Sequence, residues 1–491
     1  MMEVMVAVTP HDATRLRYAW RVCAVTSLGL VLIGIAGSTL NVALPAVVRH
    51  FQAGPLESGW ILLAFLLVNT ASLVFFGRVA DLLGRREVYL AGFALFTLAS
   101  LLAGLSPSVG FLIAMRVLQA VGAAMILANG TVIITDAFPP ERLSQGMGVY
   151  IGTMSVAQLA GPTVGGLIAE TAGWQWIFWV NVPAGLLALG VGAAILRRMP
   201  RRPRQPVDAL GNVLVFAALS ALLLALSEAG SRGPGSPVVI VGVAVFVVAV
   251  PLIVVAERRS ANPVLDLRLF GGRLLACANL ASFCNALARS ALILVVALYF
   301  QAARGVGAFE AGLSVLPVPV GIGLASPIVG MLGRRVSPYA LSIGGALLSA
   351  AGLGTLMVTA GAGTPYWVIG IGLFVAGCGS GTFLTGNTTQ VMTALPAGSL
   401  GVVNGLRVMV MNVGIVISVG LSLTVLTASV GPELRAQVYA GTLSTLSPVA
   451  VGQLMDGFQR AYAVLFAVAL AGAVLAALAR PQSAPASRAS T

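Results

Sequence analysis

Hydrophobic residues fill most of the chain in long runs, which short polar or Gly/Pro-rich segments separate. Each run is close to the roughly 20 residues that an α-helix needs to cross a bilayer. The pattern therefore predicts about fourteen membrane-spanning helices. The predicted spans are 22–45, 58–77, 88–105, 109–130, 146–168, 176–196, 209–228, 237–256, 275–299, 311–332, 339–359, 366–387, 404–428 and 461–479. The edges of 237–256 and 404–428 are indistinct, which leaves thirteen or fifteen spans open.

Composition supports an all-α polytopic membrane protein. Hydrophobic residues make up 58% of the 491 residues and charged residues only 9%, whereas a soluble domain carries about 25% charged residues. A soluble core could not bury this much apolar surface, because core size stops growing with chain length. Lipid is the solvent that removes this problem.

The charge pattern predicts the orientation of the helices. The formal net charge is +13, and the arginines gather in alternate loops, for example at Arg78, Arg85, Arg86 and in the cluster 197–204. This is the positive-inside pattern of membrane proteins rather than the basic face of a nucleic-acid-binding protein. We therefore expect a multi-pass protein of the cell membrane, with both termini cytoplasmic and no nucleic-acid partner.

The residue inventory excludes several classes of protein. Cys23, Cys277, Cys284 and Cys378 all lie in apolar runs without a CxxC pair, as small hydrophobic residues do. Two histidines far apart cannot build a metal centre, so we expect no metal and no cofactor. The chain lacks lysine, so it cannot contain the phosphate loop of an ATP-driven pump. Neither an enzyme nor a primary pump is expected.

A short motif repeats in the two halves of the chain. Gly77 opens a loop that closes with Arg85 and Arg86, and Gly330 opens one that closes with Arg334 and Arg335. Repeated halves are typical of secondary carriers. The predicted organisation is a cytoplasmic N-terminus, a six-helix half, a basic loop with two inserted spans, a second six-helix half and a disordered cytoplasmic tail. These segments are 1–21, 22–196, 197–256, 257–480 and 481–491.

The chain contains four notable motifs: the loop Gly77–Arg86, the pattern of Arg116, Gln119 and Gly122, the run Gly161–Gly166 and the stretch Trp174–Pro183. Together they give the chain a resemblance to the fourteen-span drug:proton antiporter family of the major facilitator superfamily. The loop with Gly77, Asp81, Gly84, Arg85 and Arg86 resembles that superfamily's cytoplasmic signature. The resemblance implies a latch on the cytoplasmic side that couples to rocking of the halves. Asp81 can face a helix N-terminus or pair with an arginine. The alternative is a solvated, positively charged turn.

Two further motifs lie inside predicted spans. Arg116, Gln119 and Gly122 match an R-x-x-Q-x-x-G pattern, and the resemblance gives Arg116 a role in proton coupling. The alternative is a structural arginine that neighbouring carbonyls satisfy. A further motif consists of Gly161, Pro162, Gly165 and Gly166, and it resembles the antiporter signature of exporters. The alternative is ordinary helix packing through small residues. The fourth motif, Trp174–Pro183, resembles a family hallmark that opens the sixth span.

The chain departs from the family in the first span. Ala36 stands where members often carry an aspartate, and no predicted span has Asp or Glu at its middle. Proton exchange needs a group that binds and releases a proton, usually a carboxylate. Asp81 and Glu228 remain as candidates beside Arg116. Because arginines are the charges inside the membrane, we expect a neutral or anionic substrate rather than a lipophilic dication.

Polar residues in the spans are candidates for the substrate cavity, although each is also a candidate for helix–helix packing. They are Asn41, Asn69, Gln158, Asn285, Arg289, Asn387, Arg407 and Asn412. The expected function is a monomeric secondary exporter of small hydrophobic drugs or natural products, driven by the proton gradient. The alternatives are an exporter of an endogenous lipid or metabolite, and a polytopic membrane protein that is not a carrier.

Overall fold

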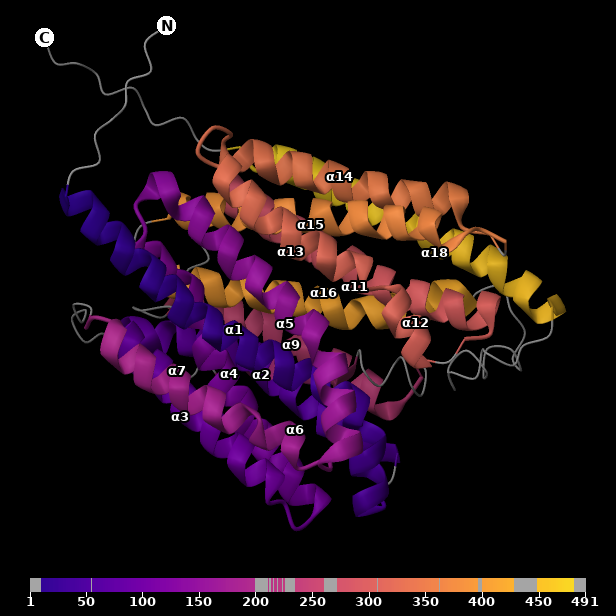
Figure 1. The fold of residues 1–491 in the computed structure, drawn as a ribbon, viewed down its shortest axis with the longest axis horizontal. Coiled ribbons are helices and arrows are strands. Elements are labelled where there is room, and N and C mark those ends of the chain that lie inside the picture. Colours follow the sequence, from indigo (N-terminus) through magenta and orange to yellow (C-terminus); the bar gives the residue numbers. More distant parts are fainter. Residues whose placement is uncertain are drawn as a thin grey trace, which may run out of the picture. The chain divides into compact units, whose positions relative to one another are not determined.

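The chain folds entirely into helices where the structure describes it (Figure 1). The computed structural model describes residues 10–53, 55–198, 235–259, 272–306, 308–361, 363–395, 400–427 and 448–480, with short runs between 211 and 225. The helices are α1 (Pro10–Phe51), α2 (Pro55–Leu83), α3 (Arg85–Gly104), α4 (Val109–Ala137), the 3₁₀ turn η1 (Pro140–Arg142), α5 (Leu143–Thr171), α6 (Trp176–Trp179), α7 (Asn181–Ile195), α9 (Pro237–Arg259), α11 (Arg273–Arg304), α12 (Ala308–Ser314), α13 (Pro317–Leu332), α14 (Pro338–Thr359), α15 (Tyr366–Ala394), α16 (Leu400–Thr427) and α18 (Pro448–Leu478).

Twelve helices in the described residues are long and apolar enough to cross a membrane. Each overlaps one predicted span, which confirms the all-α polytopic class. The predicted span 146–168 lies within α5, a continuous helix of 29 residues that is not among the twelve. The predicted span 209–228 lies largely outside the described residues. A total of fourteen spans therefore stays a prediction.

Several helices extend beyond the apolar runs that predicted them. α1 begins at Pro10, inside the predicted cytoplasmic N-terminus, and α18 begins at Pro448, 13 residues before the predicted span. Residues such as Arg15 in α1 and Asp456 in α18 are helical although they are charged. An apolar run marks the lipid-crossing part of a helix, and polar residues continue the helix into the interface and water.

Local sequence signals set the helix ends. α14 has Pro338 in its first turn, where the missing N–H costs nothing, and the Ser337 side chain accepts a hydrogen bond from the N–H of Ala340. Ser108 caps α4 in the same way. The predicted span 311–332 is divided by a turn before Pro317, so it consists of α12 and α13. Proline lacks the N–H that would join these two helices.

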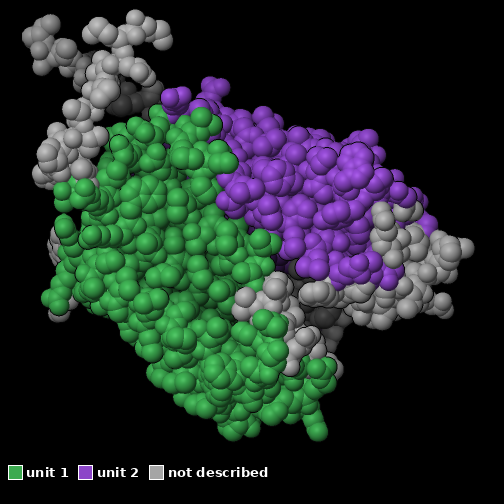
Figure 2. All heavy atoms as spheres, in the orientation of Figure 1, with its two compact units in different colours: residues 1–221, 326–334, 396–409 green, residues 222–325, 335–395, 410–491 purple. Residues whose placement is uncertain are grey.

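The chain divides into two compact units (Figure 2). Unit 1 comprises Met1–Ala221, Ser326–Arg334 and Pro396–Met409. Unit 2 comprises Leu222–Ala325, Arg335–Leu395 and Val410–Thr491. Unit 1 therefore combines the first part of the chain with the last residues of α13 and the first residues of α16.

Glycines allow close backbone contact where the end of α13 and the beginning of α16 pack against other helices of unit 1. A Cβ atom at Gly77 on α2 would lie 2.5 Å from the carbonyl oxygen of Gly401 on α16. A Cβ atom at Gly330 on α13 would lie 2.7 Å from the carbonyl oxygen of Ser144 on α5. Real Cβ atoms do not come this close to a carbonyl oxygen. Both glycines that open the repeated motif are thus sites of close helix packing.

Candidate functional site

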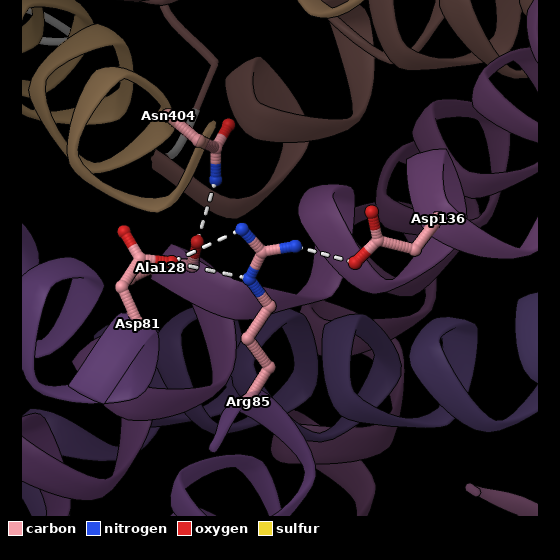
Figure 3. A network of polar contacts seen from close by, with 5 residues as sticks. All are labelled: Asp81, Arg85, Ala128, Asp136 and Asn404. Carbon is pink, nitrogen blue, oxygen red and sulfur yellow. Dashed lines mark hydrogen bonds and ion pairs between the residues drawn. The ribbon is translucent and has the colours of Figure 1, made fainter. Parts of the chain in front are cut away.

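The cytoplasmic motif in unit 1 forms an ion-pair network (Figure 3). The Nε and Nη2 atoms of Arg85 lie 3.2 and 3.0 Å from one carboxylate oxygen of Asp81, and Nη1 donates to Asp136 at the end of α4. Gly84 alone joins α2 to α3, with φ of 109°. Only glycine adopts this conformation without strain, and it places Arg85 directly after the turn. The motif therefore connects α2, α3 and α4 through one buried guanidinium.

Asp81 also lies beside the beginning of α16. A methyl group at Gly401, the second residue of α16, would lie 2.9 Å from both carboxylate oxygens of Asp81. The N-terminal turn of a helix carries partial positive charge, which favours a nearby carboxylate. Asp81 thus meets two sources of positive charge, Arg85 and the start of α16.

Asn404 adds a contact that the sequence analysis did not identify. Its side-chain amide donates to the carbonyl oxygen of Ala128 on α4 at 2.9 Å (Figure 3) and to that of Leu127 at 3.2 Å. Its own carbonyl oxygen accepts from Arg407, at 3.2 Å. Asn404 is the first residue of the predicted span 404–428, at the edge of an apolar run. The polar pair three residues apart, Asn404 and Arg407, was the available signal.

Arg86 differs from Arg85 in its partners. Its guanidinium donates to the carbonyl oxygens of Leu196 and Ala193, at 2.6 and 2.8 Å, and so satisfies the C-terminal end of α7. The corresponding pair of the second copy, Arg334 and Arg335, is exposed. Within the described residues the two copies share their glycine contact but not the buried network.

Arg116 lies fully inside unit 1 on α4, with 2% of its surface exposed. Nε donates to the carbonyl oxygen of Ile61 at 3.2 Å, Nη1 donates to Gln119, and the guanidinium lies 4.3 Å from the ring centre of Phe65. Gln119 in turn donates to Ser100 on α3 at 2.8 Å. The positive charge is therefore satisfied by dipoles and an aromatic face, which is the pairing expected of an arginine inside a membrane protein.

The glycine-rich motif lies on α5 and packs against α1. A Cβ atom at Gly161 would overlap Oγ of Ser38, and one at Gly34 would lie 2.9 Å from Cβ of Ala157. Small residues thus bring the two helices close at two points. Pro162, Gly165 and Gly166 continue the same helix, which runs unbroken from Leu143 to Thr171.

Unit 2 has a polar seam between α11 and α15. Asn285 donates to Ser380 at 3.3 Å. Asn387 donates to the carbonyl oxygen of Ala278 at 3.2 Å and accepts from Ser282 at 2.8 Å. Both asparagines therefore hold helices together within this unit. Arg289 follows Asn285 by one helical turn, and its side chain is partly exposed while its Nε is buried.

The remaining candidates are dispersed. Asn69 donates to the carbonyl oxygen of Ala120 at 3.4 Å, Gln158 is exposed on α5, and Asn412 is half-buried on α16. The side chain of Asn41 and the whole of Glu228 lie outside the described residues. Across the described part of the chain, no group of three or more His, Cys, Asp or Glu residues could hold a metal ion.

Comparison with known proteins decides the family. The family model "Major Facilitator Superfamily" matches residues 26–419. The chain belongs to the major facilitator superfamily.

Relatives within this superfamily are named for resistance and export. The chain is 32% identical to "Multidrug resistance protein Stp" of Mycobacterium tuberculosis, over 84% of this chain and 78% of that protein. It is 30% identical to "Tetracenomycin C resistance and export protein" of Streptomyces glaucescens, over 97% of this chain and 94% of that protein. These matches cover most of the chain rather than one motif.

A solved structure shares the major facilitator fold. The human organic anion transporter MFSD10 superposes with a TM-score of 0.67 over 93% of this chain and 99% of that chain, at 16% sequence identity. Likeness at this identity shows the fold alone. As a member of the superfamily, the chain is a multi-pass membrane carrier of small molecules and not an enzyme.

Proposed function

We propose that this protein is a secondary active transporter that exports hydrophobic drugs or natural products by alternating access, in exchange for protons. One observation carries the proposal: the match to the superfamily over residues 26–419 coincides with relatives named for multidrug resistance and for export. The tight contact of Gly161 with Ser38 lies on the helix whose motif resembles the exporter signature.

The ion-pair network of the cytoplasmic motif, together with Asn404, supports a carrier that changes conformation. Asp81, Arg85 and Asn404 link α2, α3 and α4 to the beginning of α16. Ion pairs and hydrogen bonds of this kind can break and re-form as helix ends separate. In the proposed cycle, these contacts hold the cytoplasmic side closed, and their release opens it toward the cytoplasm.

The charge inventory supports a neutral or anionic substrate. Arg116, Arg289 and Arg407 lie within spanning helices, whereas every acidic residue lies outside the middle of a predicted span. A pocket for a lipophilic dication would favour a buried carboxylate. A hydrophobic molecule that is neutral or negatively charged suits this interior better.

Growth inhibition tests the proposal directly. A host that lacks its own major efflux pumps should express the protein, and a panel of neutral, anionic and dicationic antibiotics and dyes should be applied. We expect at least fourfold higher inhibitory concentrations for some neutral or anionic compounds. Resistance to dications alone would contradict the substrate class, and no change for any compound would contradict export.

Proton exchange requires its own experiment. We propose that Asp81 or Glu228 carries the proton, and that Arg116 contributes to proton coupling. Asp81→Asn and Glu228→Gln remove one titrating carboxylate each while keeping side-chain size. At least one should abolish uphill export and its dependence on pH. Unchanged export and pH dependence in both variants would contradict the assignment.

A further inference from the structure

Arg289 is a charged residue of unit 2 whose chemistry the described packing of the helices does not explain. It follows Arg273 by 16 residues and precedes Arg304 by 15 on α11. At 1.5 Å per residue, it therefore lies about 24 Å from one helix end and about 22 Å from the other. Arg289 therefore lies near the middle of α11 and close to the middle of the predicted span 275–299.

The guanidinium of Arg289 has no partner in the part of the chain that the structure describes. Its Nε is buried without a hydrogen-bond acceptor, and no described carboxylate or carbonyl oxygen accepts from the side chain. Arg116, by contrast, is satisfied by Ile61, Gln119 and Phe65. A cation at this depth normally faces an internal, water-filled space and has an anionic or polar partner there.

The neighbouring side chains give this site a shape. Asn285, one turn before Arg289, uses its amide nitrogen for Ser380, and its carbonyl oxygen is buried without a partner. One turn after Arg289, Ile293 is partly exposed on the same face of α11. The guanidinium of Arg289 thus lies between a polar side chain, Asn285, and an apolar one, Ile293.

We propose that Arg289 is the anion-binding residue of the substrate site, and that it recognises a carboxylate or a similar oxyanion on a hydrophobic molecule. The inference rests on the proposed function and specifies its substrate class. Guanidinium binds such oxyanions through two parallel charge-assisted hydrogen bonds. Ile293, one turn further along the same face, would contact the apolar part of the same ligand.

The test compares a matched pair of compounds in vesicles that contain the full-length protein. One compound is an exported hydrophobic carboxylic acid from the growth panel, and the other is its primary amide, which has the same shape without the charge. The ratio of KM for the acid to KM for the amide is the readout. Arg289→Gln should raise this ratio about 10- to 100-fold, because charge-assisted hydrogen bonds are lost.

Two further variants separate charge from folding. Asn285→Asp keeps Arg289 but places a carboxylate one turn away, where it pairs with the guanidinium, so the ratio should also rise. Arg273→Gln, at the exposed end of the same helix, should leave the ratio unchanged. Ratios within about threefold of wild type in both Arg289→Gln and Asn285→Asp would overturn the inference, even if both compounds are exported. A panel in which only neutral compounds are exported would overturn the inference and leave the proposed function standing.

Discussion

At the scale of single residues, Gly161 determines how closely α5 approaches α1. A Cβ atom there would overlap Oγ of Ser38, so Gly161→Ala must push the helices apart or displace Ser38. Overpacking of this kind costs about 1–3 kcal/mol. We expect at least a tenfold loss of export, measured as drug accumulation in expressing cells. Adding Ser38→Gly to this variant should restore part of the lost export. Export by Gly161→Ala alone at the wild-type level would contradict the close contact.

Arg85 offers a second test at this scale. Arg85→Gln removes the guanidinium that pairs with buried Asp81 and with Asp136, and breaking a buried ion pair such as Arg85–Asp81 costs about 3–5 kcal/mol. We expect the apparent melting temperature in detergent to fall by several degrees. Arg334→Gln is the matched control, because Arg334 belongs to the second copy of the motif and is exposed. Equal melting temperatures for the two variants would contradict a structural role for the network.

The sequence could predict only the local part of this network. Asp81 and Arg85 are four residues apart, so their pairing is visible in the chain. Asp136 is 51 residues from Arg85, and Asn404 is 276 residues from Ala128, so only the fold brings them together. Asn404 also lay at the edge of an apolar run. Burial of a polar residue cannot be read from such an edge.

At the scale of elements, the contact between α2 and α16 depends on Gly77 and Gly401. A leucine at position 77 cannot fit 2.5 Å from a carbonyl oxygen, so Gly77→Leu should separate the helix ends. Val403 on α16 is 1% exposed. In a variant without native cysteines, the substitution Val403→Cys therefore reports whether this part of α16 becomes accessible. A membrane-impermeant maleimide should label it at least tenfold faster from the cytoplasmic side when Gly77→Leu is present. Equal labelling would contradict the contact.

Apolar runs predicted the helices well but not their ends. Twelve predicted spans overlap helices that can cross a membrane, because a run of about 20 apolar residues has few other stable structures. Helix ends depend instead on caps and prolines such as Ser337 and Pro317. These signals are too common in membrane proteins to identify an end by themselves.

At the scale of the whole molecule, the apolar runs predict fourteen spans, and the positive-inside pattern predicts that both termini are cytoplasmic. Reporter fusions test this prediction. Green fluorescent protein after residue 491 or residue 201 should fluoresce, because it folds in the cytoplasm. Alkaline phosphatase after residue 232, between the two inserted spans, should be active because it is exported. Inactive phosphatase at 232 would reduce the number of spans and contradict the inserted pair.

Uphill transport by the purified protein tests the central claim most directly. The full-length protein should be reconstituted into proteoliposomes, and a pH gradient should be imposed in either direction. Compounds from a mixed library that enter or leave the vesicles are then identified by mass spectrometry. We predict that a hydrophobic neutral or anionic compound accumulates against its gradient, reverses direction with the pH gradient and stops with a protonophore. Accumulation of no compound, or movement that ignores the pH gradient, would contradict a proton-driven exporter.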